Sequence, residues 1–156
     1  VPEPVPEPVP EPVPEPAPEA TAKAEASPPP SPSEPAAVVS AEELLGKADW
    51  NRERDRPNSA LALYKKVLSQ DENSIDAMAG IAWCLLDLNR LGQSIRMFNQ
   101  VLVKAPRFGD AHMGLAEIYR FQGKPTAAKK HYRAYLDILP NGSEAGFAKS
   151  MLRQLQ

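Results

Sequence analysis

After Ser40, apolar residues recur three and four positions apart, which is the spacing of one face of an α-helix. Two such stretches carry Ala77, Met78, Ile81, Ala82 and Leu85, and then Ile95, Phe98, Val101 and Leu102. The spacing predicts helices at about residues 41–54, 58–71, 75–88, 92–105, 109–122, 125–139 and 143–155. The pattern therefore predicts an all-α fold class.

Residues of matched chemistry recur every 34 positions in this part of the chain, without a gap. The sets are small residues at Ala48, Ala82 and Ala116 and at Ala60, Ser94 and Ala128, aromatic residues at Tyr64, Phe98 and Tyr132, and leucines at Leu68, Leu102 and Leu136. A single helical pair cannot bury its apolar face alone, so the repetition predicts three hairpins stacked around one core. We expect the aromatic rings to fill the space between the two helices of each pair.

The expected helix ends are marked by residues of the same period. Asp55, Asn89 and Gly123 are residue types that tolerate the left-handed conformation that ends a helix. Pro57 and Pro125 are placed to begin the next helix. Residues 40–43 read Ser-Ala-Glu-Glu, a capping box that opens the first unit.

This pattern resembles the tetratricopeptide repeat (TPR), a 34-residue helix-turn-helix with small residues, an aromatic residue and a closing proline, here Pro106 and Pro140. The resemblance covers repeats at about 41–74, 75–108 and 109–142, and a capping helix at about 143–155. It implies a right-handed α-solenoid of three hairpins with a terminal solvating helix. It also implies a non-enzymatic scaffold or adaptor that binds other proteins.

In that architecture the first helices of the repeats line the concave side, where side chains not needed for packing are free for a partner. The candidate partner-binding residues are Asp49, Arg52, Asp76, Trp83, Leu86, Asp87, Met113, Glu117, Arg120 and Phe121. Phe147 and Met151 on the last helix close one end. Gly80 and Gly114, beside the large apolar candidates Trp83, Leu86, Met113 and Phe121, allow either close helix packing or room for a ligand backbone.

Charge divides the expected domain into two faces. Residues 41–156 carry a net charge of +4, whereas the inner-facing residues are mostly acidic. We expect an acidic, aromatic-floored groove that favours a peptide or helix with apolar anchors and basic flanks, and a basic convex back. The best-known site of the family clamps the terminal carboxylates of chaperone tails with basic side chains. The corresponding places here look like Leu45, Asp49, Gly80, Asp110 and Gly114, of which none is basic, so that type of ligand is disfavoured.

The first forty residues have a different composition, with 14 of the 18 prolines and a net charge of −6. Residues 1–16 repeat Val-Pro-Glu-Pro four times. Alternating proline favours polyproline II without internal hydrogen bonds, and about 20 residues of it extend about 60 Å. We expect residues 1–40 to be a disordered, extended linker, similar in composition to spacers of bacterial envelope proteins. The chain begins at Val1, so we expect it to be a fragment of a larger protein, and its compartment is left open between cytoplasm and cell envelope.

Other functions find little support in the sequence. No nucleophile elbow, phosphate loop or metal-ligand spacing occurs, so we expect no enzyme activity, no cofactor and no metal. We expect Cys84 to be an inert buried thiol and His131 to be a solvated surface residue. No membrane insertion is expected, and nucleic-acid binding through the basic back is less favoured because no aromatic residues interleave its cations. Self-association through the first repeat or the Phe147/Met151 end is the open alternative.

Overall fold

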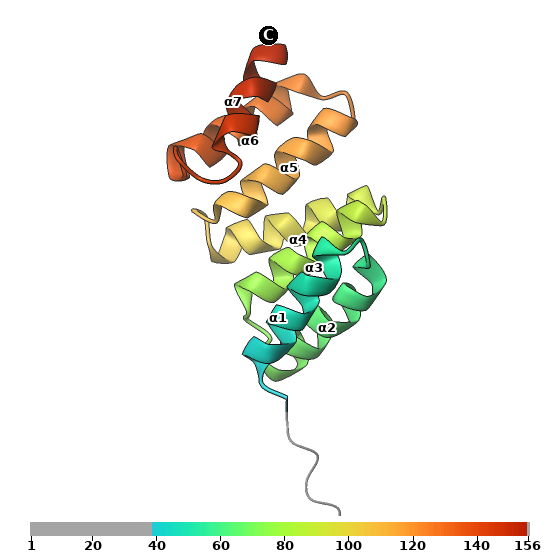
Figure 1. The fold of residues 1–156 in the computed structure, drawn as a ribbon. Helices are drawn as coiled ribbons and strands as arrows, with labels where there is room; N and C mark the ends of the chain where they lie inside the picture. The colour runs from blue at the N-terminus through green and yellow to red at the C-terminus, as the bar shows by residue number, and fades with distance from the viewer. Residues whose placement is uncertain (1–38, 156) are drawn as a thin grey trace, which may run out of the picture. The chain divides into compact units, whose positions relative to one another are not determined.

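The computed structural model describes residues 39–155, which contain α-helices and no strand. The helices are α1 (Ala41–Glu53), α2 (Pro57–Gln70), α3 (Ile75–Asp87), α4 (Leu91–Lys104), α5 (Gly109–Phe121), α6 (Pro125–Ile138) and α7 (Ala145–Gln154) (Figure 1). The all-α prediction is confirmed, and every helix begins and ends within two residues of its expected limits. The extended linker predicted for residues 1–40 lies outside the described residues, apart from Val39 and Ser40.

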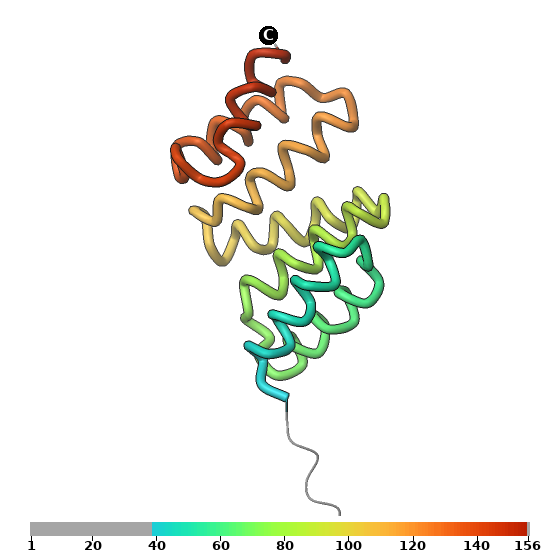
Figure 2. Tube along the Cα trace, viewed as in Figure 1, coloured from blue at the N-terminus to red at the C-terminus, as the bar shows by residue number. Residues whose placement is uncertain are grey.

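The helices form three consecutive hairpins, α1–α2, α3–α4 and α5–α6, which stack in chain order as a right-handed solenoid (Figure 2). Each hairpin also contacts the next, because α2 packs against α3 and α4 packs against α5. Helix α7 packs against α6 and covers the end of the stack. The core therefore runs along the stack as three adjoining apolar clusters rather than one central one.

The turns inside the hairpins have the geometry that their residue types predict. Asp55 and Asn89 both have φ 56°, and Gly123 has φ 66°, all in the left-handed region. At each turn the amide of the following residue donates back to the preceding helix, as Arg90 does to the Leu85 carbonyl at 2.7 Å. These bonds satisfy carbonyls that a helix end otherwise leaves unpaired.

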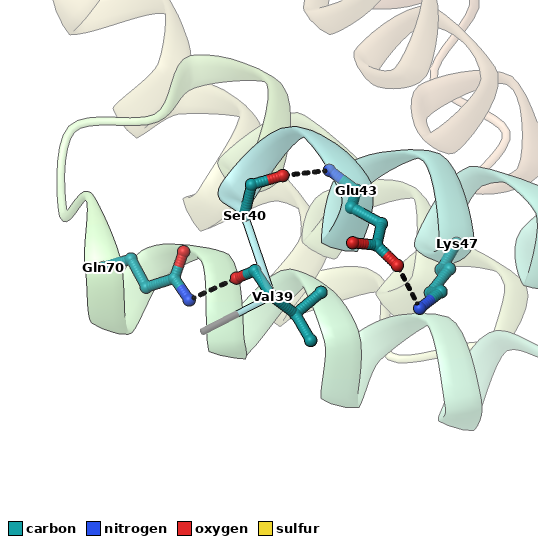
Figure 3. A network of polar contacts seen from close by, with 5 residues as sticks. All are labelled: Val39, Ser40, Glu43, Lys47 and Gln70. Carbon is teal, nitrogen blue, oxygen red and sulfur yellow. Dashed lines mark hydrogen bonds and ion pairs between the residues drawn. The ribbon is translucent and has the colours of Figure 1, made fainter. Parts of the chain in front are cut away.

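The start of α1 is capped through one half of the predicted capping box (Figure 3). The Glu43 amide donates to the Ser40 hydroxyl at 3.2 Å. The Glu43 carboxylate turns the other way and pairs with Lys47 at 2.6 Å. The Gln70 amide nitrogen donates to the Val39 carbonyl at 3.1 Å, which ties the start of the first helix to the end of the second.

Successive hairpins contact one another through an aromatic ring laid on a glycine. The Tyr64 ring of α2 lies against Gly80 of α3, and the Phe98 ring of α4 lies against Gly114 of α5, so closely that a methyl group on either glycine would overlap the ring. Close packing is thus the reason for both glycines. The rings also contact the first helix of their own hairpin, as expected: Tyr64 bonds to Asp49, Tyr132 bonds to Glu117 and Phe98 packs against Trp83. The contact of Tyr64 and Phe98 with the next hairpin was not foreseen. In the last step, α7 places Ala148 at the position 34 residues after Gly114, and it is fully buried.

Candidate functional site

Two adjoining hollows run along the first helices of the hairpins, and we call them together the groove. One, of about 350 Å³, is lined by Asp49, Arg52, Glu53, Tyr64, Asp76, Ala79, Gly80, Trp83, Phe108 and Asp110. The other, of about 450 Å³, is lined by Arg52, Trp83, Asp110, Met113, Glu117, Ser143, Glu144 and Phe147. Arg52, Trp83 and Asp110 line both hollows, so the two adjoin at these residues.

Six of the ten candidate residues from the sequence line the groove. They are Asp49, Arg52, Asp76, Trp83, Met113 and Glu117. They come from α1, α3 and α5, because equivalent positions 34 residues apart point to the same side of the stack. Phe147, from α7, closes the far end.

The other four candidates lie outside both hollows. Arg120 stands behind Glu117, to which it is bonded, and its guanidinium covers the Phe121 ring at 4.4 Å. Phe121 itself is 62% exposed. Leu86 is half-buried against the core cluster of the second hairpin, and Asp87 is exposed. A role for these four in binding stays a prediction.

Phe108, Ser143 and Glu144 line the groove without having been among the candidates. Phe108 had a recognisable sequence signal. It stands 34 residues after Ser74, whose hydroxyl caps α3, and the aromatic side chain cannot cap a helix. Ser143 and Glu144 belong to the turn before α7, where the repeat pattern ends, and no signal marked them.

In the first hairpin and again in the third, a phenol–carboxylate hydrogen bond joins the two helices of that hairpin at the floor of the groove. The Tyr64 hydroxyl donates to Asp49 at 2.5 Å, and the Tyr132 hydroxyl donates to Glu117. Burial, together with the bonded carboxylate, raises the pKa of each phenol, so both stay protonated donors at neutral pH. Arg120 completes the third-hairpin group by pairing with Glu117 at 2.7 Å.

The second hairpin has no such bond. The Phe98 ring lacks a hydroxyl, and the Trp83 indole meets it edge-on, with ring centroids 5.4 Å apart and an interplanar angle of 83°. Trp83 is only partly buried, and the rest of its surface lines both hollows. The second hairpin therefore contributes an aromatic side chain to the groove at the position where its neighbours carry a hydrogen-bonded carboxylate.

The groove is acidic. Its lining holds six carboxylates, from Asp49, Glu53, Asp76, Asp110, Glu117 and Glu144, against the single guanidinium of Arg52. Among residues 39–155, ion pairs join Lys47 to Glu43 and Arg120 to Glu117, and no other is formed. Glu117 is thus the one lining carboxylate with a cation already in contact. The others form no ion pair within residues 39–155, and Arg52 is the one cation that lines the groove beside them.

On the opposite side, two further hollows are lined by cations. Lys65, Arg90 and Arg96 line one between α2, α3 and α4, and Arg96 and Lys104 line its neighbour. No carboxylate lines either hollow. The division into an acidic inner side and a basic back, expected from the sequence, is present in these linings.

The remaining groups with distinctive chemistry lie away from the groove or beneath it. Cys84 is fully buried, and burial raises the pKa of its thiol to about 11, as expected for an inert cysteine. His131 was wrongly expected to be solvated. Its ring is half-buried, stacks on Tyr119 with centroids 5.6 Å apart, and places Nδ1 at 3.1 Å from Nδ1 of His112. The helix phase alone did not show that α5 and α6 bring these side chains together.

Neither a metal cluster nor a membrane span is found in the described part of the chain. Within residues 39–155, no three His, Cys, Asp or Glu side chains gather as metal ligands. None of α1 to α7 combines the length and apolar character needed to cross a bilayer.

Comparison with known proteins agrees with this architecture. Two family models described as tetratricopeptide repeat match residues 52–107 and 80–143. The tetratricopeptide repeat and J domain-containing co-chaperone DNJ1 of Fusarium oxysporum f. sp. lycopersici is 32% identical over 102 residues. That match covers 65% of this chain but 20% of the co-chaperone, so the chain spans about a fifth of its relative's length.

Solved structures share the fold at low sequence identity. The second TPR domain of human RPAP3, solved with the HSP70 peptide SGPTIEEVD, has a TM-score of 0.62 and 16% identity, covering 74% of this chain and 93% of that one. The Yersinia enterocolitica type III secretion chaperone SycD, solved with a peptide of the translocator YopD, has a TM-score of 0.65 and 15% identity, covering 73% and 90%. With three gapless 34-residue hairpins and two matching family models, this chain belongs to the tetratricopeptide repeat family of protein-interaction domains.

Proposed function

We propose that the groove binds a segment of a partner protein, a peptide or helix that carries apolar anchors and basic flanks. The observation that carries this proposal is Trp83, a large aromatic side chain left partly open in the middle of the groove. Met113 and Phe147 line the same hollow. Aromatic side chains in a concave site are frequent energetic centres of protein interfaces.

The negative charge of the groove supports a ligand with basic flanks. The lining carries six carboxylates and one guanidinium, so a cationic segment is attracted and an anionic one repelled. Similar folds hold peptides, as SycD and human RPAP3 do in the structures named above. The RPAP3 peptide ends in two glutamates, a valine and an aspartate, and the acidic groove here opposes such a tail.

In this proposal the chain acts as the adaptor part of a larger protein and performs no catalysis itself. Self-association is the alternative, and one observation favours it. Gly46 is equivalent to Gly80 and Gly114, yet no side chain lies within 4 Å of a Cβ placed on it, and nearby Trp50 is 47% exposed. Sedimentation of the full chain over a range of concentrations separates a self-associating chain from a monomeric receptor.

The test is selection of a random peptide library displayed on phage against the full 156-residue chain. We expect enriched peptides that contain an apolar residue near Lys or Arg. Their binding is lost on Trp83→Ala and kept on Trp50→Ala, a matched change of the other, exposed tryptophan. Equal binding of both variants, with helical content intact by circular dichroism, contradicts the assignment to the groove.

A further inference from the structure

The three hairpins differ at one set of equivalent positions in and around the groove. The first and third hairpins carry an acid, an arginine and a tyrosine at positions where the second carries three apolar side chains. The sets, each 34 residues apart, are Asp49, Trp83 and Glu117; Arg52, Leu86 and Arg120; and Tyr64, Phe98 and Tyr132. The exchange is complete, since all three members change together.

The first and third hairpins pack without a tryptophan at the position of Trp83. In the first hairpin the same two helices are joined by the Tyr64–Asp49 bond, and the third hairpin has its counterpart in Tyr132 and Glu117. Both arrangements sit in the same helical frame. A tryptophan with surface open to the groove therefore points to a ligand that contacts it, since two other hairpins pack without one.

Charge is distributed unevenly about this apolar centre. Toward α1 and the start of α3, the carboxylates of Asp49, Glu53 and Asp76 form no ion pair within the described residues, although Asp49 accepts a hydrogen bond from Tyr64 and Arg52 lines the same hollow. On the other side, Glu117 is already held by Arg120 and Tyr132 and is only 14% exposed. Negative charge available to a ligand is thus concentrated at the α1 end. Of the remaining carboxylates, Asp110 lines both hollows and Glu144 lines only the one at the α7 end.

The α7 end of the groove is where the apolar lining residues gather. Trp83, Met113 and Phe147 line its hollow of about 450 Å³, beside the polar side chains of Arg52, Asp110, Glu117, Ser143 and Glu144. Phe147 is held edge-on against Tyr132, with centroids 6.3 Å apart, and is 38% exposed. The Arg120–Glu117 pair borders this hollow without an unpaired charge of its own.

We infer that the groove is directional: the ligand lays Lys or Arg side chains over Asp49, Glu53 and Asp76 and inserts one apolar side chain between Trp83, Met113 and Phe147. This inference rests on the proposed function and narrows it. The occupant is a partner segment with its basic cluster on one side of a single Leu, Met or aromatic anchor, rather than on both sides. Trp83 selects the anchor, and the unpaired carboxylates fix which way the segment runs.

The test measures whether each end of the groove recognises its own part of the ligand. The probes are the peptide acetyl-Lys-Arg-Lys-Gly-Ser-Phe-Gly-Ser-amide and the same residues in reverse order, titrated into the full chain by calorimetry. The protein variants are Asp49→Asn with Asp76→Asn for the acidic end, and Trp83→Glu with Leu86→Arg and Phe98→Tyr for the apolar end. The second set copies the third hairpin, so the helices keep a packing that this chain already uses.

We expect the triple variant that copies the third hairpin to weaken binding of the tighter-binding peptide at least tenfold, about 1.4 kcal/mol. It should have little effect on binding once the peptide's Phe is replaced by Ala. The Asp variants are expected to weaken it about threefold to tenfold, and to have little effect once the peptide's basic residues are Gln. The single change Trp83→Ala, with helicity measured alongside, replaces the triple variant if that variant does not fold.

The outcomes separate the two proposals. Two results overturn the direction but leave a receptor groove. In one, the effect of the Asp substitutions depends on the peptide's Phe. In the other, the substitutions at both ends of the groove change binding equally for every peptide. Failure of both probes at millimolar concentration overturns the direction also. Failure of the phage selection as well overturns the proposed function itself.

Discussion

The phenol ring of Tyr64 occupies the space that a side chain on Gly80, one hairpin further along the chain, would take. Phe98 and Gly114 repeat the contact at the next step of the stack. In both contacts the ring occupies the space that a side chain would take. Whether this space is filled at a glycine of the series therefore shows whether a preceding hairpin is stacked there. At Gly46, the first position of the series, no ring is present.

The first prediction concerns this contact. Gly80→Ala forces the Tyr64 ring to move within a packed interior, and we expect a loss of about 1 to 3 kcal/mol in the free energy of unfolding. Urea denaturation followed by circular dichroism measures it. Gly46→Ala is the matched control, since nothing opposes the new methyl group and the better helix propensity of alanine adds up to about 1 kcal/mol. If both substitutions stabilise the chain to the same extent, the ring is not where we place it.

The second prediction concerns the bond between Tyr64 and Asp49. Tyr64→Phe removes the hydroxyl but keeps the ring on Gly80, and we expect it to lower the free energy of unfolding by about 1 kcal/mol. A double-mutant cycle with Asp49→Ala isolates the bond from the packing of the ring. Tyr64→Phe costing as much in the Asp49→Ala background as in the wild type would show that the hydroxyl does not act through this carboxylate.

The third prediction concerns acid. Burial, with smaller effects of the charges on His112 and Lys130, lowers the pKa of His131 from 6.5 to about 4. Between these values the unfolded chain binds the proton more tightly than the folded one. The contribution of His131 to stability is therefore complete above pH 6.5 and is lost as the pH falls toward 4. Thermal midpoints measured between pH 7 and 4.5 should fall accordingly.

A control for the acid prediction comes from the second hairpin, which has Met78 and Met97 at the positions equivalent to His112 and His131. The double substitution His112→Met and His131→Met removes the titrating pair but keeps an apolar contact of a kind already present. We expect the fall in thermal midpoint to be smaller in this variant. An unchanged pH profile would assign the acid sensitivity to other groups.

The fourth prediction concerns ligand charge. The nonapeptide SGPTIEEVD, which occupies the RPAP3 structure, presents two glutamates, an aspartate and a terminal carboxylate. We expect no binding by calorimetry at millimolar peptide in low salt, where repulsion by the groove is strongest. Substituting Asp49→Lys and Asp76→Lys should reduce that repulsion. Micromolar binding by the wild type would contradict the acidic character of the groove.

Much of the fold followed from the period of the sequence, because a gapless repeat fixes which residues are equivalent. The left-handed turns at Asp55, Asn89 and Gly123 and the helix starts at Pro57 and Pro125 follow from single residue types. The equivalence of positions does not show which side chains contact one another, however. The repeat pattern therefore did not reveal that Tyr64 also contacts Gly80 of the next hairpin.

The candidate site was recovered in part for the same reason. The helix phase placed Asp49, Trp83 and Met113 on the groove side, where the structure has them. It gave no account of rotamers, so it did not foresee that Arg120 turns back to Glu117 and covers Phe121. Such pairings depend on side-chain geometry across elements, which residue spacing does not contain.

The central claim is that a partner segment contacts the groove at Trp83. The chain has two tryptophans, so a nitrogen–proton correlation spectrum of the labelled full chain shows two indole resonances, one of them from Trp50, which is exposed and lines neither hollow of the groove. On titration with a peptide enriched by selection, the account predicts that the Trp83 indole resonance shifts and saturates while that of Trp50 stays in place. A saturating shift of Trp50 with Trp83 unmoved would contradict it.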